Sequence, residues 1–121
     1  MEKRCIEFVR GDTFLISRYF KDKEDNILTL NPKEDELTFT VRDNIYSPVI
    51  IQKKLSDMEI SQDGKYTIVL NPSDTESLDC KTYKYDLEIR IGKNEKNPYV
   101  ITPESGTITL QEFDFSRPEE K

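Results

Sequence analysis

The sequence predicts an all-β fold, an immunoglobulin-like antiparallel β-sandwich of seven to eight strands with one short helical turn. Alanine, the best helix former, is absent from the 121 residues, whereas the strand-favouring Ile, Val, Thr, Tyr and Phe are plentiful. Three segments alternate apolar and polar residues with a period of two, as half-buried strands do. Turn residues such as Asp63-Gly64 separate the segments, and no stretch repeats at a fixed period.

The first half of the chain contains four predicted strands. The first two flank a turn at Gly11-Asp12, and polar connections over residues 21–26 and 31–36 lead to the third. The fourth begins after Pro48, because proline cannot donate a hydrogen bond to a strand ladder. The predicted strands are Ile6–Val9, Phe14–Phe20, Leu37–Arg42 and Val49–Leu55.

The second half contains one helical turn and the remaining strands. Asn71–Leu78 is the helical candidate, since Asn71 can cap it and Pro72 suits its first position. The strands predicted around it are Tyr66–Leu70, Thr82–Ile91, a short piece at Tyr99–Ile101 and Thr107–Phe113. In the last of these, Ile108 and Leu110 are expected to point inward.

The strict alternation also assigns the interior. The predicted core consists of Leu37, Phe39, Val41, Tyr66, Ile68, Leu70, Tyr85, Leu87 and Ile89. Tyr83 begins the longest strand directly after a polar corner. It is either an ordinary core tyrosine or a corner tyrosine, whose hydroxyl bonds back to the backbone as in many sandwiches.

Length and charge limit the architecture and the partners. The length fits one domain, assigned to residues 1–113, followed by a charged flexible tail at 114–121. Twenty-four acidic and 18 basic residues give a net charge of −6, which disfavours a nucleic-acid partner. No apolar run approaches the roughly 18 residues that span a bilayer, and the N-terminus lacks the apolar core of a signal peptide. We therefore expect no membrane partner.

The sequence predicts a protein that is not an enzyme. Histidine, the commonest general base, is absent, and the 4 glycines fit no phosphate-binding loop or nucleophile elbow. Cys5 and Cys80 are either reduced, as in most intracellular proteins, or joined in one disulfide. Two cysteines without histidine cannot complete a four-ligand zinc site, so no metal and no cofactor are expected.

Two short motifs have a functional and a structural interpretation, and the structural one is favoured for both. Arg10-Gly11-Asp12 spells an integrin-type tripeptide, but it also fits a turn between two strands. Asp22–Asn26 offers oxygen ligands for calcium, but Ile27 stands where an EF-hand loop requires glycine. We expect a solvated turn at both places.

Two strands carry apolar residues on both faces, which an antiparallel strand with one wetted face does not need. These strands are Phe14–Phe20 and Val49–Leu55, and the candidate docking face comprises Leu15, Ile50 and Gln52. One explanation is that the outer faces bind another subunit or protein. The other is that the strands lie under loops or bend over a corner of the sandwich.

Exposed tyrosines suggest an alternative function, a carbohydrate-binding or cell-surface module. Tyr19, Tyr46 and Tyr99 lie in loops or off the main inward faces and are the candidate glycan contacts. Tryptophan, the usual stacking surface for sugars, is absent. Ordinary rim or core tyrosines explain the same pattern.

The order of six motifs resembles a known family. The motifs are Gly11–Phe14, Phe20–Leu30, Leu37–Asp43, Gly64–Leu70, Tyr83–Ile89 and Ser105–Leu110. Together they resemble an immunoglobulin-like module of tailed phages and prophages, found at the N-terminus of baseplate upper proteins and in related virion accessory proteins. Two positions depart from that family: Lys81 and Asp25-Asn26 stand where it usually has glycine.

The resemblance implies a non-catalytic structural or adaptor protein of a phage particle, a docking module associated with the baseplate or tail. It carries over no catalytic residues. The partners it implies are other virion or tail proteins, with a homo-oligomer as a further option. The expected location is the bacterial cytoplasm during assembly and then the virion.

Overall fold

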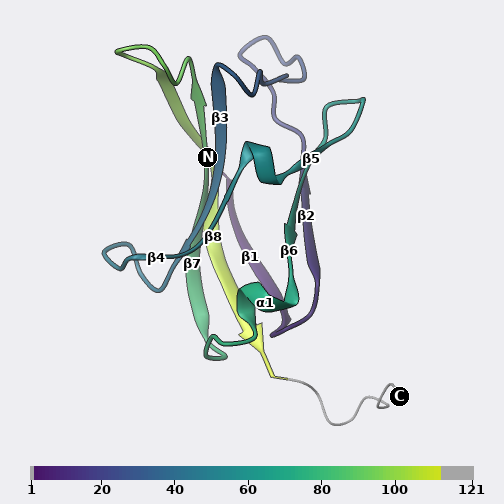
Figure 1. The fold of residues 1–121 in the computed structure, drawn as a ribbon, viewed down its shortest axis with the longest axis vertical. Helices are drawn as coiled ribbons and strands as arrows, with labels where there is room; N and C mark the ends of the chain where they lie inside the picture. The colour runs from purple at the N-terminus through teal and green to yellow at the C-terminus, as the bar shows by residue number, and fades with distance from the viewer. Residues whose placement is uncertain (1, 113–121) are drawn as a thin grey trace.

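The computed structural model describes residues 2–112, which form two β-sheets packed face to face. The strands are β1 (Glu2–Val9), β2 (Phe14–Arg18), β3 (Asp35–Arg42), β4 (Val49–Lys54), β5 (Glu59–Ile60), β6 (Tyr66–Leu70), β7 (Thr82–Ile91) and β8 (Tyr99–Gln111). A 3-10 turn, η1 (Leu55–Asp57), and one short helix, α1 (Pro72–Thr75), connect them. Figure 1 shows the two layers, and the predicted all-β sandwich is confirmed.

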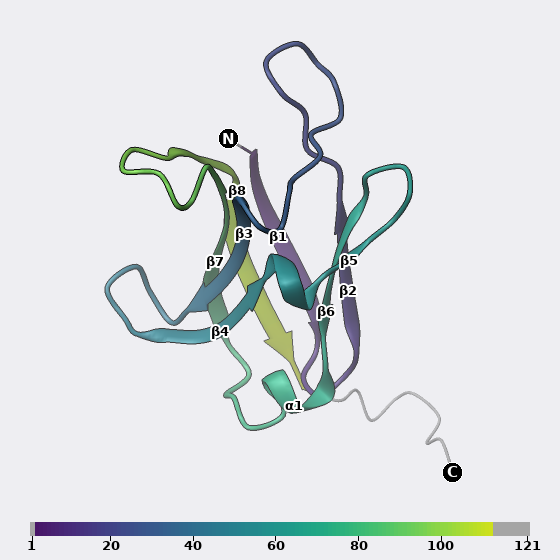
Figure 2. The same cartoon turned by 45° about the horizontal axis from the view of Figure 1, so that its top comes forward.

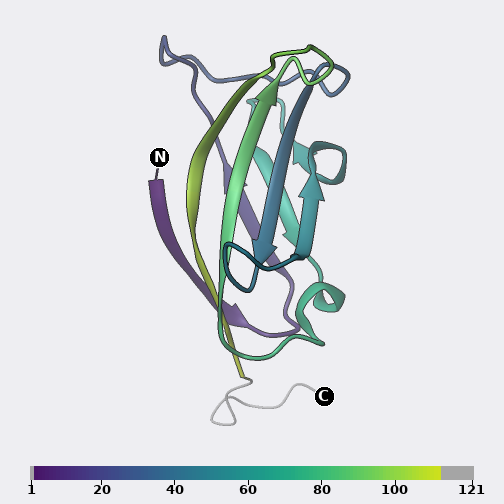
Figure 3. The same ribbon diagram turned by 90° about the vertical axis from the view of Figure 1, so that its left-hand side faces the viewer.

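The larger sheet has the strand order β1-β8-β7-β3-β4, and the smaller one has the order β2-β6-β5. Figure 3 looks onto the outer face of the larger sheet. Not every pair is antiparallel as predicted, because β1 runs parallel to β8. The first strand belongs to the larger sheet and the second to the smaller one, so β1 is left beside the last strand of the chain and points the same way.

The prediction places β6 and β7 at their observed bounds, and the other strands differ at their ends. β2 stops at Arg18 instead of Phe20, and Leu55 already belongs to η1. The short strand β5 and η1 were not predicted. The two pieces predicted at the C-terminal end are one strand, β8, whose register against β7 shifts between Ile101 and Glu104. Pro103 lies at this irregularity, where its missing N–H costs no ladder bond.

Two predicted features extend beyond the described residues. The last predicted strand ends at Phe113 and the charged tail covers 114–121, and these residues lie outside the range that the structure describes.

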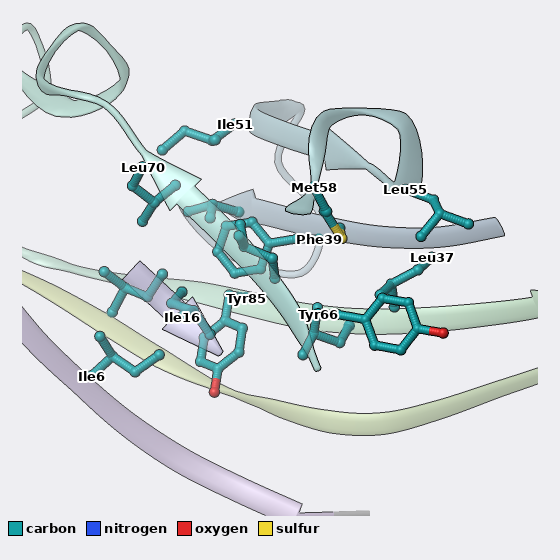
Figure 4. Packing of buried hydrophobic residues seen from close by; sticks show 14 of the residues in the cluster. Ile6, Ile16, Leu37, Phe39, Ile51, Leu55, Met58, Tyr66, Leu70 and Tyr85 are labelled. Carbon is teal, nitrogen blue, oxygen red and sulfur yellow. The ribbon is translucent and has the colours of Figure 1, made fainter. Parts of the chain in front are cut away.

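The interior lies between the sheets. All nine residues of the predicted core are at most 3% exposed, and Ile108 and Leu110 are also buried. In Figure 4, Ile16, Tyr66 and Leu70 from the smaller sheet meet Leu37, Phe39 and Tyr85 from the larger one. The alternation that predicted the core therefore reflects one face of each sheet turned toward the other.

The helix begins where the sequence predicts and is shorter than expected. Asn71 precedes it, and its backbone N–H donates to the Asp74 carboxylate at 2.7 Å. Regular helix ends at Thr75, whose hydroxyl accepts from the Gly11 N–H at 2.8 Å. This bond fixes the turn between β1 and β2, so the structure supports the turn interpretation of Arg10-Gly11-Asp12.

The acidic loop after β2 is a hydrogen-bonded turn. One carboxylate oxygen of Asp22 accepts the backbone N–H groups of Glu24 and Asn26 at 2.9 and 3.0 Å. The left-handed residue of the loop is Asp25, with φ of 67°. The Asp22 carboxylate therefore organises the loop backbone, as the structural interpretation predicts.

Tyr83 is a corner tyrosine. Its ring is buried, and its hydroxyl donates to the backbone carbonyl of Asp79 at 2.8 Å. Burial raises the pKa of this phenol. Lys81, which replaces the glycine of the resembling family, leaves the corner bond in place and pairs with Asp43 at 2.8 Å.

We expect Tyr83→Phe to lower the free energy of unfolding by about 0.5–1.5 kcal/mol, the usual net contribution of one hydrogen bond. The ring stays in the core, and the exposed backbone at Asp79 can be rehydrated. Urea denaturation measures the change. Tyr46→Phe is the control, because Tyr46 is 91% exposed. An equal loss in both variants would contradict a specific role for the corner bond.

Candidate functional site

Large apolar side chains gather on the hairpin between β3 and β4. Ile45 is 67% and Tyr46 91% exposed, and Val49 and Ile50 follow at 40% and 38%. We call these four residues the hairpin patch. In Figure 2 the connection between β3 and β4 projects from the sandwich. Exposed apolar groups that lie together in this way typically mark a contact surface.

The hairpin is held by hydrogen bonds. The Asn44 side chain accepts from the Tyr46 N–H at 2.9 Å, and its carbonyl accepts from the Ser47 N–H at 3.0 Å. Arg42 donates to the Ser47 carbonyl at 2.9 Å. The apolar side chains are thus presented on an ordered backbone, which lowers the entropic cost of binding a partner.

A register shift explains why β4 carries apolar residues on both faces. Val41 pairs with Ile51 and Arg42 pairs with Val49, so Ile50 has no opposite residue on β3. The extra residue interrupts the alternation. Ile51 remains in the core while Val49 and Ile50 are both exposed.

A trough crosses the outer face of the larger sheet beside the hairpin. One hollow of about 490 Å³ extends from β1 to β3, and a second of about 420 Å³ extends from β7 and β3 to β4. Both are lined by Thr40, Arg42 and Asp86, which makes them continuous. Ile45 of the hairpin patch lines the first hollow. We refer to the two hollows together as the trough.

The trough is rich in cations although the chain is acidic. Its lining includes Lys3, Arg42, Lys54 and Lys84, and none of these four has an ion pair within residues 2–112. Burial and repulsion from Glu88 raise the pKa of the Asp86 carboxyl, and Arg42 opposes this shift. Positive charge therefore dominates the groups of the trough that lack an ion pair within residues 2–112.

A buried carboxylate ties the two sheets together at the opposite side of the larger sheet. Glu104 on β8 is 3% exposed and accepts two hydrogen bonds from the Arg18 guanidinium of β2, at 2.7 and 3.1 Å. The Tyr85 hydroxyl also donates to Glu104, and Arg4 lies 3.6 Å from it. Side chains from β1, β2 and β7 therefore compensate the buried negative charge of Glu104.

These contacts set the ionisation of the cluster. Burial alone would raise the pKa of Glu104, but the hydrogen bonds from Arg18 and Tyr85 and the nearby positive charges hold it below its ordinary value of 4.5. Burial and the bond to Glu104 raise the pKa of Tyr85. Hydrogen bonding to Glu104 also raises the pKa of Arg18. Glu104 is thus held as a carboxylate, paired and enclosed, which is the arrangement of a structural ion pair.

The structure does not unite the predicted docking residues. Leu15 is 58% exposed on β2, on the outer face of the smaller sheet, whereas Ile50 and Gln52 belong to β4 of the larger one. Gln52 lies opposite Thr40 and lines the trough. The three residues therefore form two surfaces on opposite sides of the sandwich.

The candidate glycan-binding tyrosines are also dispersed. Tyr19 follows β2, and its hydroxyl donates to the Asp63 carboxylate. This hydrogen bond raises the pKa of the Tyr19 phenol. Tyr99 lies opposite Ile91 at one end of β7, while Tyr46 follows Arg42, which pairs with the other end of that strand. The seven residue-to-residue steps from Lys84 to Ile91 span about 23 Å. Tyr46 and Tyr99 therefore do not share one sugar-binding platform.

Cys5 and Cys80 are both free thiols, so the disulfide alternative is not realised in the structure. Within residues 2–112, no group of three or more His, Cys, Asp or Glu side chains could hold a metal ion. No helix in the described part of the chain is long and apolar enough to cross a membrane.

A scan against protein-family models and a search of curated proteins gave no match to this chain. The hairpin patch, the trough and the Glu104 cluster are therefore interpreted from their own geometry.

Proposed function

We propose that this chain is a non-catalytic docking module of a tailed-phage or prophage particle, and that it binds a baseplate or tail protein through the hairpin patch. The observation that carries the docking role is the gathering of Ile45, Tyr46, Val49 and Ile50 on one ordered hairpin. The phage setting is supported by the order of the sequence motifs, which resembles baseplate modules.

The edge of the larger sheet adds to the docking role. Among the described residues 2–112, β4 pairs only with β3, so its other side has backbone N–H and C=O groups that a partner strand can bind. Aromatic and aliphatic side chains beside such an edge act as anchors, with Tyr among the residues most often found at binding hot spots. A standard interface buries about 800 Å² on each partner. The hairpin patch would lie near its centre.

A carbohydrate-binding function has less support from the geometry. Tyr46 and Tyr99 lie at opposite ends of the larger sheet, and Tyr19 already donates to Asp63. The geometry therefore favours docking over carbohydrate binding.

We expect Ile50→Lys to weaken binding to the tail protein that co-purifies with the chain by at least tenfold, which corresponds to about 1.4 kcal/mol. The charge would have to be desolvated inside the interface. Leu15→Lys makes the same kind of change on the outer face of the smaller sheet and should alter binding less than twofold. Calorimetry gives the two affinities, and mass spectrometry of purified particles gives the amount incorporated.

Two results would contradict the proposal. One is an equal loss of affinity for the tail protein in Ile50→Lys and Leu15→Lys, which would show that binding does not depend on the hairpin patch. The other is a chain missing from purified particles, together with flanking genes that encode metabolic enzymes.

A further inference from the structure

We propose that the trough on the outer face of the larger sheet binds an extended acidic peptide segment of the partner protein, with Lys3 and Lys84 as its main carboxylate contacts. This inference deepens the proposed function, because it states the chemistry of the partner that the hairpin patch anchors.

Charge complementarity is the first argument. The chain has a net charge of −6, yet the trough contains Lys3, Arg42, Lys54 and Lys84 without ion pairs among residues 2–112. The remaining cations of the second hollow are already paired: Arg90 lies 3.2 Å from Glu88 and Lys93 lies 3.6 Å from Glu36. The unpaired groups therefore favour carboxylates.

The floor of the first hollow gives a bound segment room. It is formed by small residues, Thr40 on β3, Gly106 and Thr107 on β8 and Cys5 on β1, with Asp86 of β7 lying between β3 and β8. The cations come from the strands around them, with Lys3 on β1, Lys84 on β7 and Arg42 on β3. Charged groups that surround a floor of small side chains can reach a backbone or side chain lying between them.

The width of the trough fits a short extended peptide. Four strand-to-strand spacings of about 4.8 Å separate β1 from β4, so the trough is about 19 Å across. An extended chain rises about 3.3 Å per residue, so about six residues cross it. At one side the segment would meet Ile45 and continue toward the hairpin patch. An acidic segment that also carries apolar residues matches both the cations and this wall.

A nucleic acid fits less well. Phosphate contacts need a continuous basic surface, and here Asp86, Glu88 and Glu36 lie among the cations. Carboxylates spaced along a peptide can pair with individual lysines and leave the intervening positions to polar groups.

The test uses a fluorescein-labelled ten-residue peptide of alternating Glu and Leu, with fluorescence anisotropy as the measurement. We expect saturable binding, and a loss of at least tenfold when every Glu of the peptide is replaced by Gln. The double variant Lys3→Gln/Lys84→Gln should also bind at least tenfold more weakly. Lys23→Gln/Lys65→Gln removes the same two charges from loops outside the trough and should change affinity less than twofold.

Three other outcomes would overturn the inference. Equal losses in the two double variants would show non-specific attraction. Tighter, lysine-dependent binding of a single-stranded oligonucleotide would assign the trough to nucleic acid, and lysine-dependent dimers in sedimentation would assign it to a second copy of the chain. Amide shifts in NMR spectra of the Lys3→Gln/Lys84→Gln variant show that it is folded. If the unmodified chain binds the acidic peptide but is missing from purified phage particles, the proposed function is contradicted and this inference still stands.

Discussion

Replacing Glu104 with Ala is expected to lower the free energy of unfolding by about 3–5 kcal/mol, the cost of removing one partner of a buried ion pair. Arg18 would keep its position beside the core without the carboxylate that accepts its two hydrogen bonds, and the Tyr85 hydroxyl would lose its acceptor. The smaller sheet would also lose its charged connection to β8. Urea denaturation followed by circular dichroism measures the loss.

Two further variants separate charge from packing. Glu104→Gln keeps the shape and one acceptor oxygen, so its loss should be smaller than that of Glu104→Ala. The double variant Arg18→Met/Glu104→Leu replaces the pair with apolar groups of similar volume and should recover part of the stability, because the Tyr85 hydroxyl still lacks its acceptor. A Glu104→Ala variant as stable as the unmodified protein would show that the cluster contributes nothing.

The same carboxylate predicts a pH dependence. The folded-state pKa of Glu104 lies below its ordinary value of 4.5, so the folded protein binds this proton less readily than the unfolded chain does. Its contribution is therefore complete above the unfolded pKa and is lost as pH falls through the lower folded value. Glu104→Gln should lack this part of the acid-induced loss, which denaturation at pH 7 and pH 3 would measure.

Strand alternation predicted the parts of the fold in which every second side chain enters the core. β6 and β7 lie at their predicted bounds, because all inward positions from Tyr66 to Leu70, and from Tyr83 to Ile89, are apolar. The rule fails at β8, where the irregularity at Pro103 makes Ile101 and Glu104 face inward at a spacing of three. A prediction based on a period of two therefore splits β8 into two separate strands.

The buried cluster and the candidate docking surface depend on contacts between distant segments, which strand alternation does not encode. Glu104 and Arg18 are 86 positions apart, and a carboxylate at an inward position ordinarily argues against burial. The hairpin patch had a local indication: Ile45-Tyr46 is an apolar pair inside a turn otherwise made of Asp, Asn, Ser and Pro. Ile50 was singled out from the sequence and is exposed on β4, but its separation from Leu15 follows from which sheet each strand joins.

At Gly106 the addition of a single methyl group is expected to lower the free energy of unfolding strongly. Arg4 of β1 lies opposite it, and a Cβ added at Gly106 would overlap the carbonyl group of Arg4. The obstacle is backbone, so no side chain can rotate away. We expect Gly106→Ala to cost about 3 kcal/mol or more, at the upper end of the range for overpacking.

Thr107→Ala is the matched control for Gly106→Ala, because it changes the neighbouring residue of β8 without adding atoms. Its cost should stay below about 1 kcal/mol, the span of strand propensities. Urea denaturation gives both values, and hydrogen exchange of the β1 amides locates the change. Gly106→Ala with normal stability and normal protection of β1 would show that the two strands can move apart without loss.

The consequences of Gly106→Ala should reach both the core and the trough, because β1 contributes to each. Its inward residues Ile6 and Phe8 are buried, and Arg4 lies beside Glu104, so displacing the strand removes core packing and one cation of the buried cluster. Its outward residue Lys3 lines the trough. We therefore expect Gly106→Ala to weaken binding of the acidic peptide even at temperatures where the rest of the sandwich remains folded. Unchanged peptide affinity in a Gly106→Ala protein with exposed β1 amides would show that Lys3 is dispensable, which would contradict its role as a main carboxylate contact.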